Sequence, residues 1–443
     1  MRWSFAGSML VGLCMCIAAS PAYARQGGPG SDLVRLFFDC PPPGCGDLDF
    51  FRREVAFVNW VFDREAGDVH VLVTSQATGG GGRQYTLAFI GLGDFEGVDH
   101  ELVHSTSGDA TADEQRNGLA EKLKLGLVRY AQVTSAADRL RVSFGDGNGG
   151  PEPGADGVPG GVSPADDPWN FWVFRLSGNG FVNGQATSKF SNYFAQVQAS
   201  RTTEAWKLSV EGSFSRNVQT FEIPEEDETV TVVSETREDW NTESLVVRSV
   251  GERWAVGILS ELGSSTLLNQ DYRWSVKPGV EFNFLPYAES SRRSLTLQYL
   301  IGPVHFDYRE PTIFAKTSES VPQQSLTGRI SLVQPWGRWS TSLTGSQYLH
   351  DTSKYNVALS GSFNVRLFRG FSVRLGGNYS WIRDQLYLGA AGATEEQILL
   401  RQRQLGTSYQ YFTSFGIEYR FGSIFNNVVN PRFGGSEGNV FFF

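Results

Sequence analysis

The stretch YNVALSGSFNVRLF, residues 355–368, alternates apolar and polar side chains along its whole length. Tyr355, Val357 and Leu359 fall on one face, whereas Asn356 and Ser360 fall on the other. A period of two residues is typical of a β-strand, whose successive side chains point to opposite faces of the sheet. The pattern predicts a strand that separates an apolar environment from a polar one.

The same alternation recurs along the C-terminal region, residues 169–421. We predict twelve strands there, at residues 170–183, 188–200, 205–222, 229–250, 254–266, 270–285, 293–309, 318–334, 338–350, 354–368, 371–388 and 405–421. Ten or fourteen strands fit the pattern as alternatives. An even number places both ends of a barrel on one side of a membrane.

Alternation by itself does not distinguish a soluble sandwich from a membrane barrel. The segments commonly run for 11 to 16 residues, whereas strands of globular proteins average about 5 to 6. Trp206, Trp254, Trp339, Tyr272 and Tyr419 stand near segment ends on the presumed outer face, as in an interfacial girdle. Tight connections alternate with longer polar ones. These features favour a transmembrane antiparallel β-barrel.

The first 24 residues resemble a secretory signal peptide. Arg2 supplies a positive start, residues 9–19 form an apolar core, and Ala22-Tyr23-Ala24 is a small-x-small cleavage site. The sequence after residue 24 contains no run of about 18 apolar residues, so it predicts no membrane-spanning helix. We therefore expect an outer-membrane protein whose mature chain begins at Arg25.

The amino-acid composition supports a β-rich membrane protein and argues against a nucleic-acid-binding protein. Gly is abundant at 50 residues, aromatics reach 13% and charged residues only 19%, which suits a β-rich chain with many turns. A formal net charge of -9 and a pI near 5.3 argue against a nucleic-acid partner.

Residues 32–143 predict a small α+β domain on the periplasmic side. We expect strands at 33–38, 68–76, 83–93 and 139–144, and helices at 47–62 and 111–131. Thr111 and Glu114 have the spacing of a capping box. Residues 144–168 are rich in Gly and Pro and nearly lack apolar side chains, which predicts a flexible linker.

Cys40 and Cys45 are the two cysteines that remain after processing. In an oxidising compartment they are candidates for a disulfide, with a free pair or a zinc site as alternatives. Other polar clusters, at 78–86, 94–101, 146–148 and 222–228, fit turns or solvated loops at least as well as phosphate, metal or calcium sites. We expect no metal and no cofactor.

The stretch SFGIEYRF, residues 414–421, carries a family resemblance. Its Ser414, Gly416, Tyr419 and Phe421 resemble the C-terminal β-signal of bacterial outer-membrane β-barrel proteins. The resemblance implies insertion by the barrel-assembly machinery, with outer-membrane lipid around the barrel. It departs from the family because residues 422–443 follow, and we predict that this extension enters the barrel mouth or docks on the N-terminal domain. That domain is similar in outline to small periplasmic domains of envelope proteins, which implies a periplasmic protein partner of unknown identity.

The inward face of the predicted barrel holds more basic than acidic residues. The lumen-lining candidates are Arg175, Lys207, Glu211, Arg248, Glu261, Arg273, Lys277, Glu281, Arg329, Arg366, Arg374, Glu418 and Arg420. They fit a pore that favours anions, because a confined set of like charges focuses potential. They also fit a closed lumen braced by ion pairs.

We predict no catalytic residue. Ser346 and His350 share a strand face but lie about 13 Å apart along it, too far for direct proton transfer, and His305 has no better claim. The leading hypothesis is a non-enzymatic barrel for transport or envelope anchoring with a periplasmic interaction domain. The alternatives are a structural or assembly protein with a closed lumen, or a surface lipid hydrolase.

Overall fold

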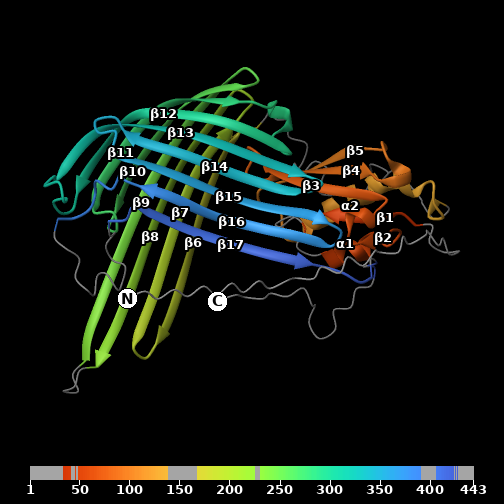
Figure 1. Cartoon of the computed structure of the whole chain (residues 1–443), viewed down its shortest axis with the longest axis horizontal. Helices are drawn as coiled ribbons and strands as arrows, with labels where there is room; N and C mark the ends of the chain where they lie inside the picture. Colours follow the sequence, from red (N-terminus) through yellow and green to blue (C-terminus); the bar gives the residue numbers. More distant parts are fainter. Residues whose placement is uncertain are drawn as a thin grey trace, which may run out of the picture.

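The computed structural model describes residues 33–40, 45, 48–137, 167–224, 230–390, 406–423, 425 and 427. They form a five-stranded sheet in the N-terminal domain and a twelve-stranded sheet in the C-terminal region (Figure 1). The signal peptide at residues 1–24 and the strand predicted at 139–144 lie outside the described residues, as does nearly all of the linker at 144–168.

The five-stranded sheet is mixed, with the order β2-β1-β3-β4-β5. Its strands are β1 Arg35–Asp39, β2 Asn59–Val61, β3 Val69–Ala77, β4 Arg83–Gly91 and β5 His100–Thr106. β1 runs parallel to β2 and β3, whereas β3, β4 and β5 form an antiparallel meander. Two 3-10 turns, η1 Arg64–Ala66 and η2 Gly93–Phe95, lie in the connections.

Two α-helices cover one face of this sheet, α1 Leu48–Glu54 and α2 Ala112–Ala131. The predicted capping box begins α2, because the Thr111 hydroxyl accepts from the Glu114 amide and the Glu114 carboxylate accepts from the Thr111 amide. Leu119, Leu123 and Leu127 of α2 pack in a core with Leu87 and Phe89 of the sheet. The opposite face, which carries Phe37, Asp39, His70, Leu72 and Thr74, has no helix over it among the described residues.

Two predictions for this domain were wrong. The helix expected at 47–62 ends at Glu54, because the Asn59 amide donates to Val34 and residues 59–61 join the edge of β1 as β2. β5 begins at His100, within the cluster at 94–101 that fitted a solvated loop. Its pairing with β4 draws the segment into the sheet. Both errors share a cause, since strand pairing overrides weak local pattern.

The twelve predicted strands of the C-terminal region are confirmed. They are β6 Trp172–Gln185, β7 Ser188–Thr202, β8 Trp206–Pro224, β9 Val230–Val250, β10 Trp254–Ser265, β11 Gln270–Asn283, β12 Arg293–Tyr308, β13 Ser318–Gln334, β14 Gly337–Tyr348, β15 Tyr355–Phe368, β16 Phe371–Ile382 and β17 Tyr409–Tyr419. Each pairs antiparallel with its neighbour in sequence. Short turns join them at one end, where Gly251 and Gly370 adopt positive φ. We call this end, where β6 begins and β17 finishes, the domain-side end, and the opposite one the far end.

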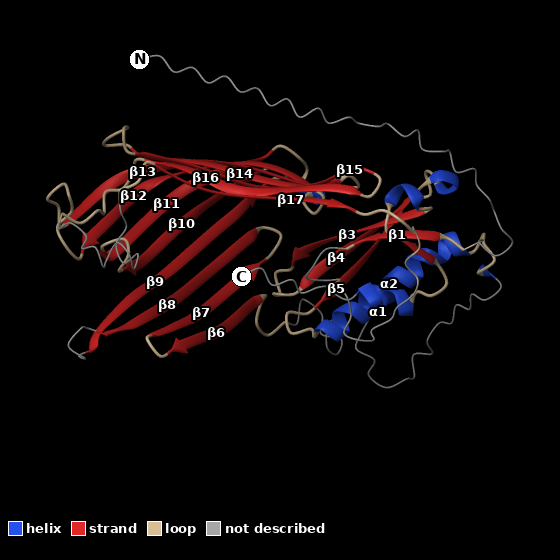
Figure 2. Cartoon of the chain, turned by 60° about the horizontal axis from the view of Figure 1, so that its bottom comes forward, coloured by secondary structure: helices blue, strands red, loops and turns tan. Residues whose placement is uncertain are grey.

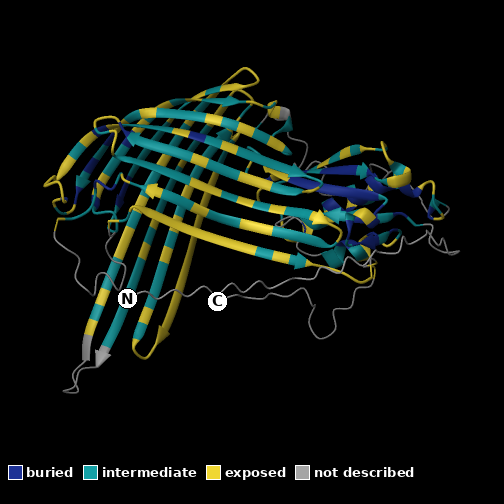
Figure 3. Ribbon diagram, viewed as in Figure 1, coloured by how far each residue is buried: buried dark blue, intermediate teal, exposed yellow. Residues whose placement is uncertain are grey.

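The ladder runs from β6 to β17, and no pairing joins these two edge strands among the described residues. Figure 2 shows them on opposite sides of an opening along the rolled sheet. Exposure alternates along the strands, with apolar residues the more exposed (Figure 3). No described helix combines the length and the apolar character needed to cross a membrane.

Candidate functional site

The two faces of the large sheet differ in chemistry. On the apolar face, β10 exposes Trp254, Val256 and Ile258. On the polar face, Glu261 of the same strand forms ion pairs with Arg273 at 2.9 Å and with Lys277 at 3.5 Å. A hollow of about 210 Å³ on the polar face is lined by residues from β7 through β11. A hollow that spans five strands requires curvature toward that face, so the polar face is the concave one.

Strand register places every lumen-lining candidate on the polar face except Arg248. Arg248 pairs with Trp206 and Val256 on the apolar face, and its guanidinium lies 5.4 Å from the Trp206 ring centre. The prediction was wrong here because Val246 and Val247 interrupt the alternation of β9. A shift of one residue moves every side chain to the other face.

The register also adds charged residues that the sequence did not single out. Glu243 lies between Glu211 and Glu261 on adjacent strands, and Arg338 pairs with Val333 on the same polar face. The acids Asp239 and Glu319 lie toward the far end. The basic residues near the domain-side ends of their strands are Arg175, Lys207, Arg329, Arg338, Arg366 and Arg374. Glu281 and Glu418 also lie near domain-side strand ends, so basic side chains outnumber acidic ones at the end of the polar face toward the N-terminal domain.

Apolar side chains occupy the concave face at the far end. Val304, Phe306 and Tyr308 of β12 cluster with Val321, Tyr348 and Leu386, all less than a tenth exposed. Leu386 comes from the connection after β16, so a loop folds back onto the concave face. This cluster narrows the space inside the sheet at that end.

The N-terminal domain packs against the domain-side end of the sheet, where β15 and β17 finish (Figure 1). Asp39 at the end of β1 forms an ion pair with Arg366 of β15, whose guanidinium nitrogen lies 2.9 Å from a carboxylate oxygen. A guanidinium nitrogen of Arg338 in β14 lies 3.9 Å from the other oxygen. The Arg366 guanidinium also stacks 4.7 Å from the Phe37 ring centre. One acid of the domain is thus held between two basic side chains of the large sheet.

Further contacts are distributed around the same end of the sheet. Arg175 of β6 donates to the Gly81 carbonyl at 3.4 Å, and Arg292 before β12 pairs with Glu101 at 3.4 Å. The Trp60 amide donates to the Asn427 side chain at 2.6 Å, and Phe425 bridges to Val61. The domain therefore touches the edge strand β6, the residue before β12 and the segment after β17. The described residues of the predicted extension at 422–443 contact β2, and the rest of it lies outside the described residues.

His70 lies behind this contact and is fully buried. Its Nδ1 accepts from Arg64 at 3.2 Å, and its Nε2 lies 3.8 Å from Asp39, too far for a hydrogen bond. Burial lowers the pKa of His70. Burial raises the pKa of Asp39, but His70 and the charges of Arg366 and Arg338 more than offset this, so that pKa lies below its ordinary value. The carboxylate is ionised and available to the two arginines.

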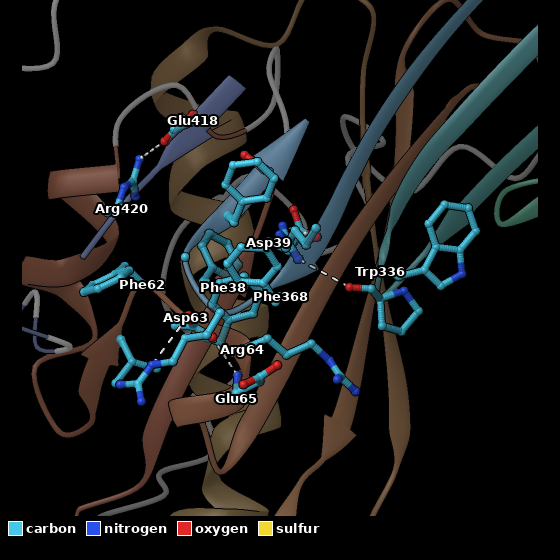
Figure 4. A pocket seen from close by; sticks show the side chains of 18 of the residues that line it. Phe38, Asp39, Phe62, Asp63, Arg64, Glu65, Trp336, Phe368, Glu418 and Arg420 are labelled. Carbon is cyan, nitrogen blue, oxygen red and sulfur yellow. Dashed lines mark hydrogen bonds and ion pairs between the residues drawn. The ribbon is translucent and has the colours of Figure 1, made fainter. Parts of the chain in front are cut away.

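A cavity of about 710 Å³ lies between the domain and the sheet end (Figure 4). The domain contributes aromatic and charged side chains to its lining, namely Phe38, Trp60, Phe62, Asp63 and Arg64. The sheet contributes side chains of the same kinds, namely Trp336, Arg366, Phe368, Arg369, Phe371, Arg374, Glu418 and Arg420. Glu418 pairs with both Arg374 and Arg420. Aromatic rings and guanidinium groups thus line one common space.

The β-signal residues lie in and just after β17, next to residues that line this cavity. Tyr419 and Phe421 stack with ring centres 5.5 Å apart on the apolar face, beside Phe368 and Phe371. The Ser414 hydroxyl donates to the Gly376 carbonyl at 3.2 Å, and Gly416 pairs with Arg374. These contacts fix the last strand, and recognition by an assembly machinery stays a prediction.

Cys40 and Cys45 form a disulfide with Cα atoms 5.6 Å apart, next to Asp39. In the described part of the chain, no three His, Cys, Asp or Glu residues are grouped to hold a metal ion. From the cluster at 94–101, Asp99 accepts from the Gly91 amide at 2.9 Å and His100 stacks on Phe89 with ring centres 4.5 Å apart. These two side chains therefore have structural contacts.

One polar constellation was missed from the sequence. His305 Nδ1 lies 2.7 Å from the Ser320 hydroxyl, and His305 Nε2 lies 3.3 Å from an Asp307 carboxylate oxygen, near the far end on the apolar face. His305 pairs with Ser320 across β12 and β13, a relation that spacing along the chain does not show. Ser346 and His350, the pair weighed instead, share no hydrogen bond in the structure; the His350 ring lies beside Tyr348.

No protein-family model and no curated protein matches the chain. Among solved structures, the chain is similar to one described as "NanC porin structure in rhombohedral crystal form". The identity is 9%, the match covers 56% of this chain and 99% of that one, and the TM-score is 0.28. A likeness this distant does not bear on function.

Proposed function

We propose that this chain is an outer-membrane β-barrel protein for the passage of small solutes, with its N-terminal domain as a cover over the periplasmic mouth. The domain-side end then faces the periplasm, the apolar face meets outer-membrane lipid, and the concave face lines the path. The single observation that carries the proposal is the contact between Asp39 of the domain and Arg366 at the basic end of the concave face.

The distribution of charge supports a preference for anions. Basic side chains gather near the domain-side ends of their strands, whereas Asp239 and Glu319 lie toward the far end. A confined group of like charges raises the local concentration of counter-ions. We therefore expect anions to enter at the periplasmic mouth once the domain moves away.

Planar-bilayer conductance with reversal potentials tests this function. The native chain is expected to conduct weakly, because the domain covers one end and the apolar cluster around Phe306 narrows the other. Asp39→Asn is expected to raise the frequency of opening and to give anion-selective currents. Silence of the native chain, of Asp39→Asn and of a chain lacking residues 32–143 would favour the alternative, a closed barrel that anchors the domain.

The His305 constellation supports a second candidate function, hydrolysis of acyl esters at the cell surface. Ser320, His305 and Asp307 have the order of a nucleophile, a base and an orienting carboxylate. His305 would take the Ser320 proton as the oxygen attacks the acyl carbonyl, and then give it to the departing alcohol. Water would release the acyl group from Ser320.

A fluorophosphonate probe and a short-chain p-nitrophenyl ester test the second function. Labelling and hydrolysis that are lost in Ser320→Ala and retained in Ser346→Ala would support it. A native chain that neither takes the label nor cleaves the ester would remove this candidate.

A further inference from the structure

The cavity between the domain and the sheet end has two chemically different walls. Glu418 is shared by Arg374 and Arg420, so these three side chains carry one positive charge in excess. The two arginine side chains are 61% and 59% exposed, which leaves guanidinium N–H groups open to a further acceptor. A second carboxylate or a phosphate is the partner that such a fork accepts.

A second basic group faces the same cavity. Arg369 lies 3.8 Å from Asp63, beyond hydrogen-bond distance, and the buried Asp63 Oδ2 accepts no hydrogen bond within the described residues. This pair is electrically balanced but loosely joined. Of the other charged residues that line the cavity, Arg366 pairs with Asp39, Arg52 pairs with Asp49, and Arg64 adjoins Glu65 in sequence. The surplus positive charge therefore lies on Arg374 and Arg420.

Aromatic rings form the other wall. Phe368 and Phe371 stack in parallel with ring centres 4.7 Å apart, and the Phe62 ring lies 6.0 Å from the Arg420 guanidinium. Phe368 is 57% exposed and borders the apolar face of the sheet. An apolar group that lay along these rings would keep an attached anion within reach of the arginines.

We propose that this cavity binds an anionic amphiphile, with its carboxylate or phosphate on Arg374 and Arg420 and its apolar body against Phe62, Phe368 and Phe371. A volume of about 710 Å³ suits a ligand of the size of a small drug. A cationic ligand is disfavoured because the excess positive charge of Arg374 and Arg420 repels it. A neutral sugar is disfavoured because it leaves that positive charge uncompensated. This site depends on the docked domain and not on whether the barrel conducts.

The probe is 4-phenylbutyrate, titrated calorimetrically into the folded full-length protein in a zwitterionic detergent. We expect saturable binding of one molecule per chain, at least tenfold weaker binding of neutral 4-phenylbutanamide, and none of acetate. Arg374→Gln and Arg420→Gln are each expected to weaken binding about tenfold. Arg329→Gln, near the same end of the sheet but outside this cavity, bonded to Gln298 and without a contact to the domain among the described residues, is the matched control and should bind like the native chain.

Phe368→Ala tests the apolar wall and should weaken both phenylbutyl ligands alike. Heat-modifiable gel mobility shows whether each variant is folded. The proposal is overturned if the folded native chain shows no saturable binding, or if the Arg374 and Arg420 variants bind as tightly as the control. Since conductance is measured separately, a silent barrel with a functional site and a conducting barrel without one are distinguishable.

The anion could come from a membrane lipid or from a soluble acid, and competition distinguishes these sources. Displacement of 4-phenylbutyrate by dihexanoylphosphatidylglycerol, but not by dihexanoylphosphatidylcholine, supports the proposal with an anionic lipid as ligand. Lack of displacement by either lipid, together with the charge-dependent binding above, supports it with a soluble acid as ligand.

Discussion

Replacing Asp39 by Asn is expected to loosen the N-terminal domain from the barrel without unfolding either part. The carboxylate lies 2.9 Å from Arg366, and its side chain is 15% exposed against 35% for the arginine. A hydrogen bond between charged groups contributes about 1.5–3 kcal/mol, whereas a neutral one contributes about 0.5–1.5. Asn keeps an acceptor and loses the charge, so we expect a loss of about 1.4 kcal/mol, which is a tenfold shift toward the undocked state. Arg338, at 3.9 Å, adds little.

A buried thiol can report this shift. Thr74 lies on the same sheet face as Asp39 and is 6% exposed, so Thr74→Cys is a reporter that reacts with a maleimide when the domain moves away. Where re-docking is faster than labelling, the rate is proportional to the undocked fraction. Asp39→Asn and Arg366→Gln should each raise the rate about tenfold. The double variant should also show a total increase of about tenfold, rather than a hundredfold, because both substitutions remove the same interaction.

The matched control is Asp49→Asn, which removes an ion pair with Arg52 of 2.6 Å inside the domain and leaves the barrel contact intact. Its labelling rate should equal that of the parent. The reasoning is refuted if Asp39→Asn leaves the rate unchanged, or if the double variant shows the product of the two single effects.

Three further predictions concern the N-terminal domain. Burial lowers the pKa of His70, His100 and His104, so the unfolded chain binds protons below about pH 6.5 before the folded domain does. The melting temperature of the domain should therefore fall between pH 7.5 and 5.5, and a rise would contradict the burial of these rings. The depressed pKa of Asp39 places its own loss of stabilisation below about pH 3.8, outside that window. Thr111→Ala removes the hydroxyl that caps α2 and should lower the free energy of unfolding of the domain by about 1 kcal/mol. An unchanged free energy of unfolding in urea would show that the cap does not stabilise the domain. A methyl group at Gly126 would overlap the Phe89 ring, so Gly126→Ala should destabilise the domain by about 1–3 kcal/mol; a gain of about 1 kcal/mol, as helix propensity alone gives, would refute the packing of α2 on β4.

The local features of this protein follow from its sequence. Alternation with a period of two gave the twelve strands and placed Arg273, Lys277 and Glu281 on one face, because side-chain direction in a strand depends only on position along the chain. The spacing of Thr111 and Glu114 gave the start of α2 for a similar reason, since a cap joins residues three apart. Where the pattern itself is broken, at Val246 and Val247, the face of Arg248 was predicted wrongly.

Contacts between distant segments were decided by the tertiary structure. Asp39 and Arg366 lie more than three hundred residues apart in sequence, and the residues around either one do not predict their ion pair. The same holds for β2 beside β1, for Ser320 beside His305, and for the cavity whose walls come from both ends of the chain. Such contacts depend on which strands pair within a sheet and on how the two sheets meet. Periodicity fixes the direction of each side chain within its own strand, but it contains no information on which surface of another element that side chain will meet.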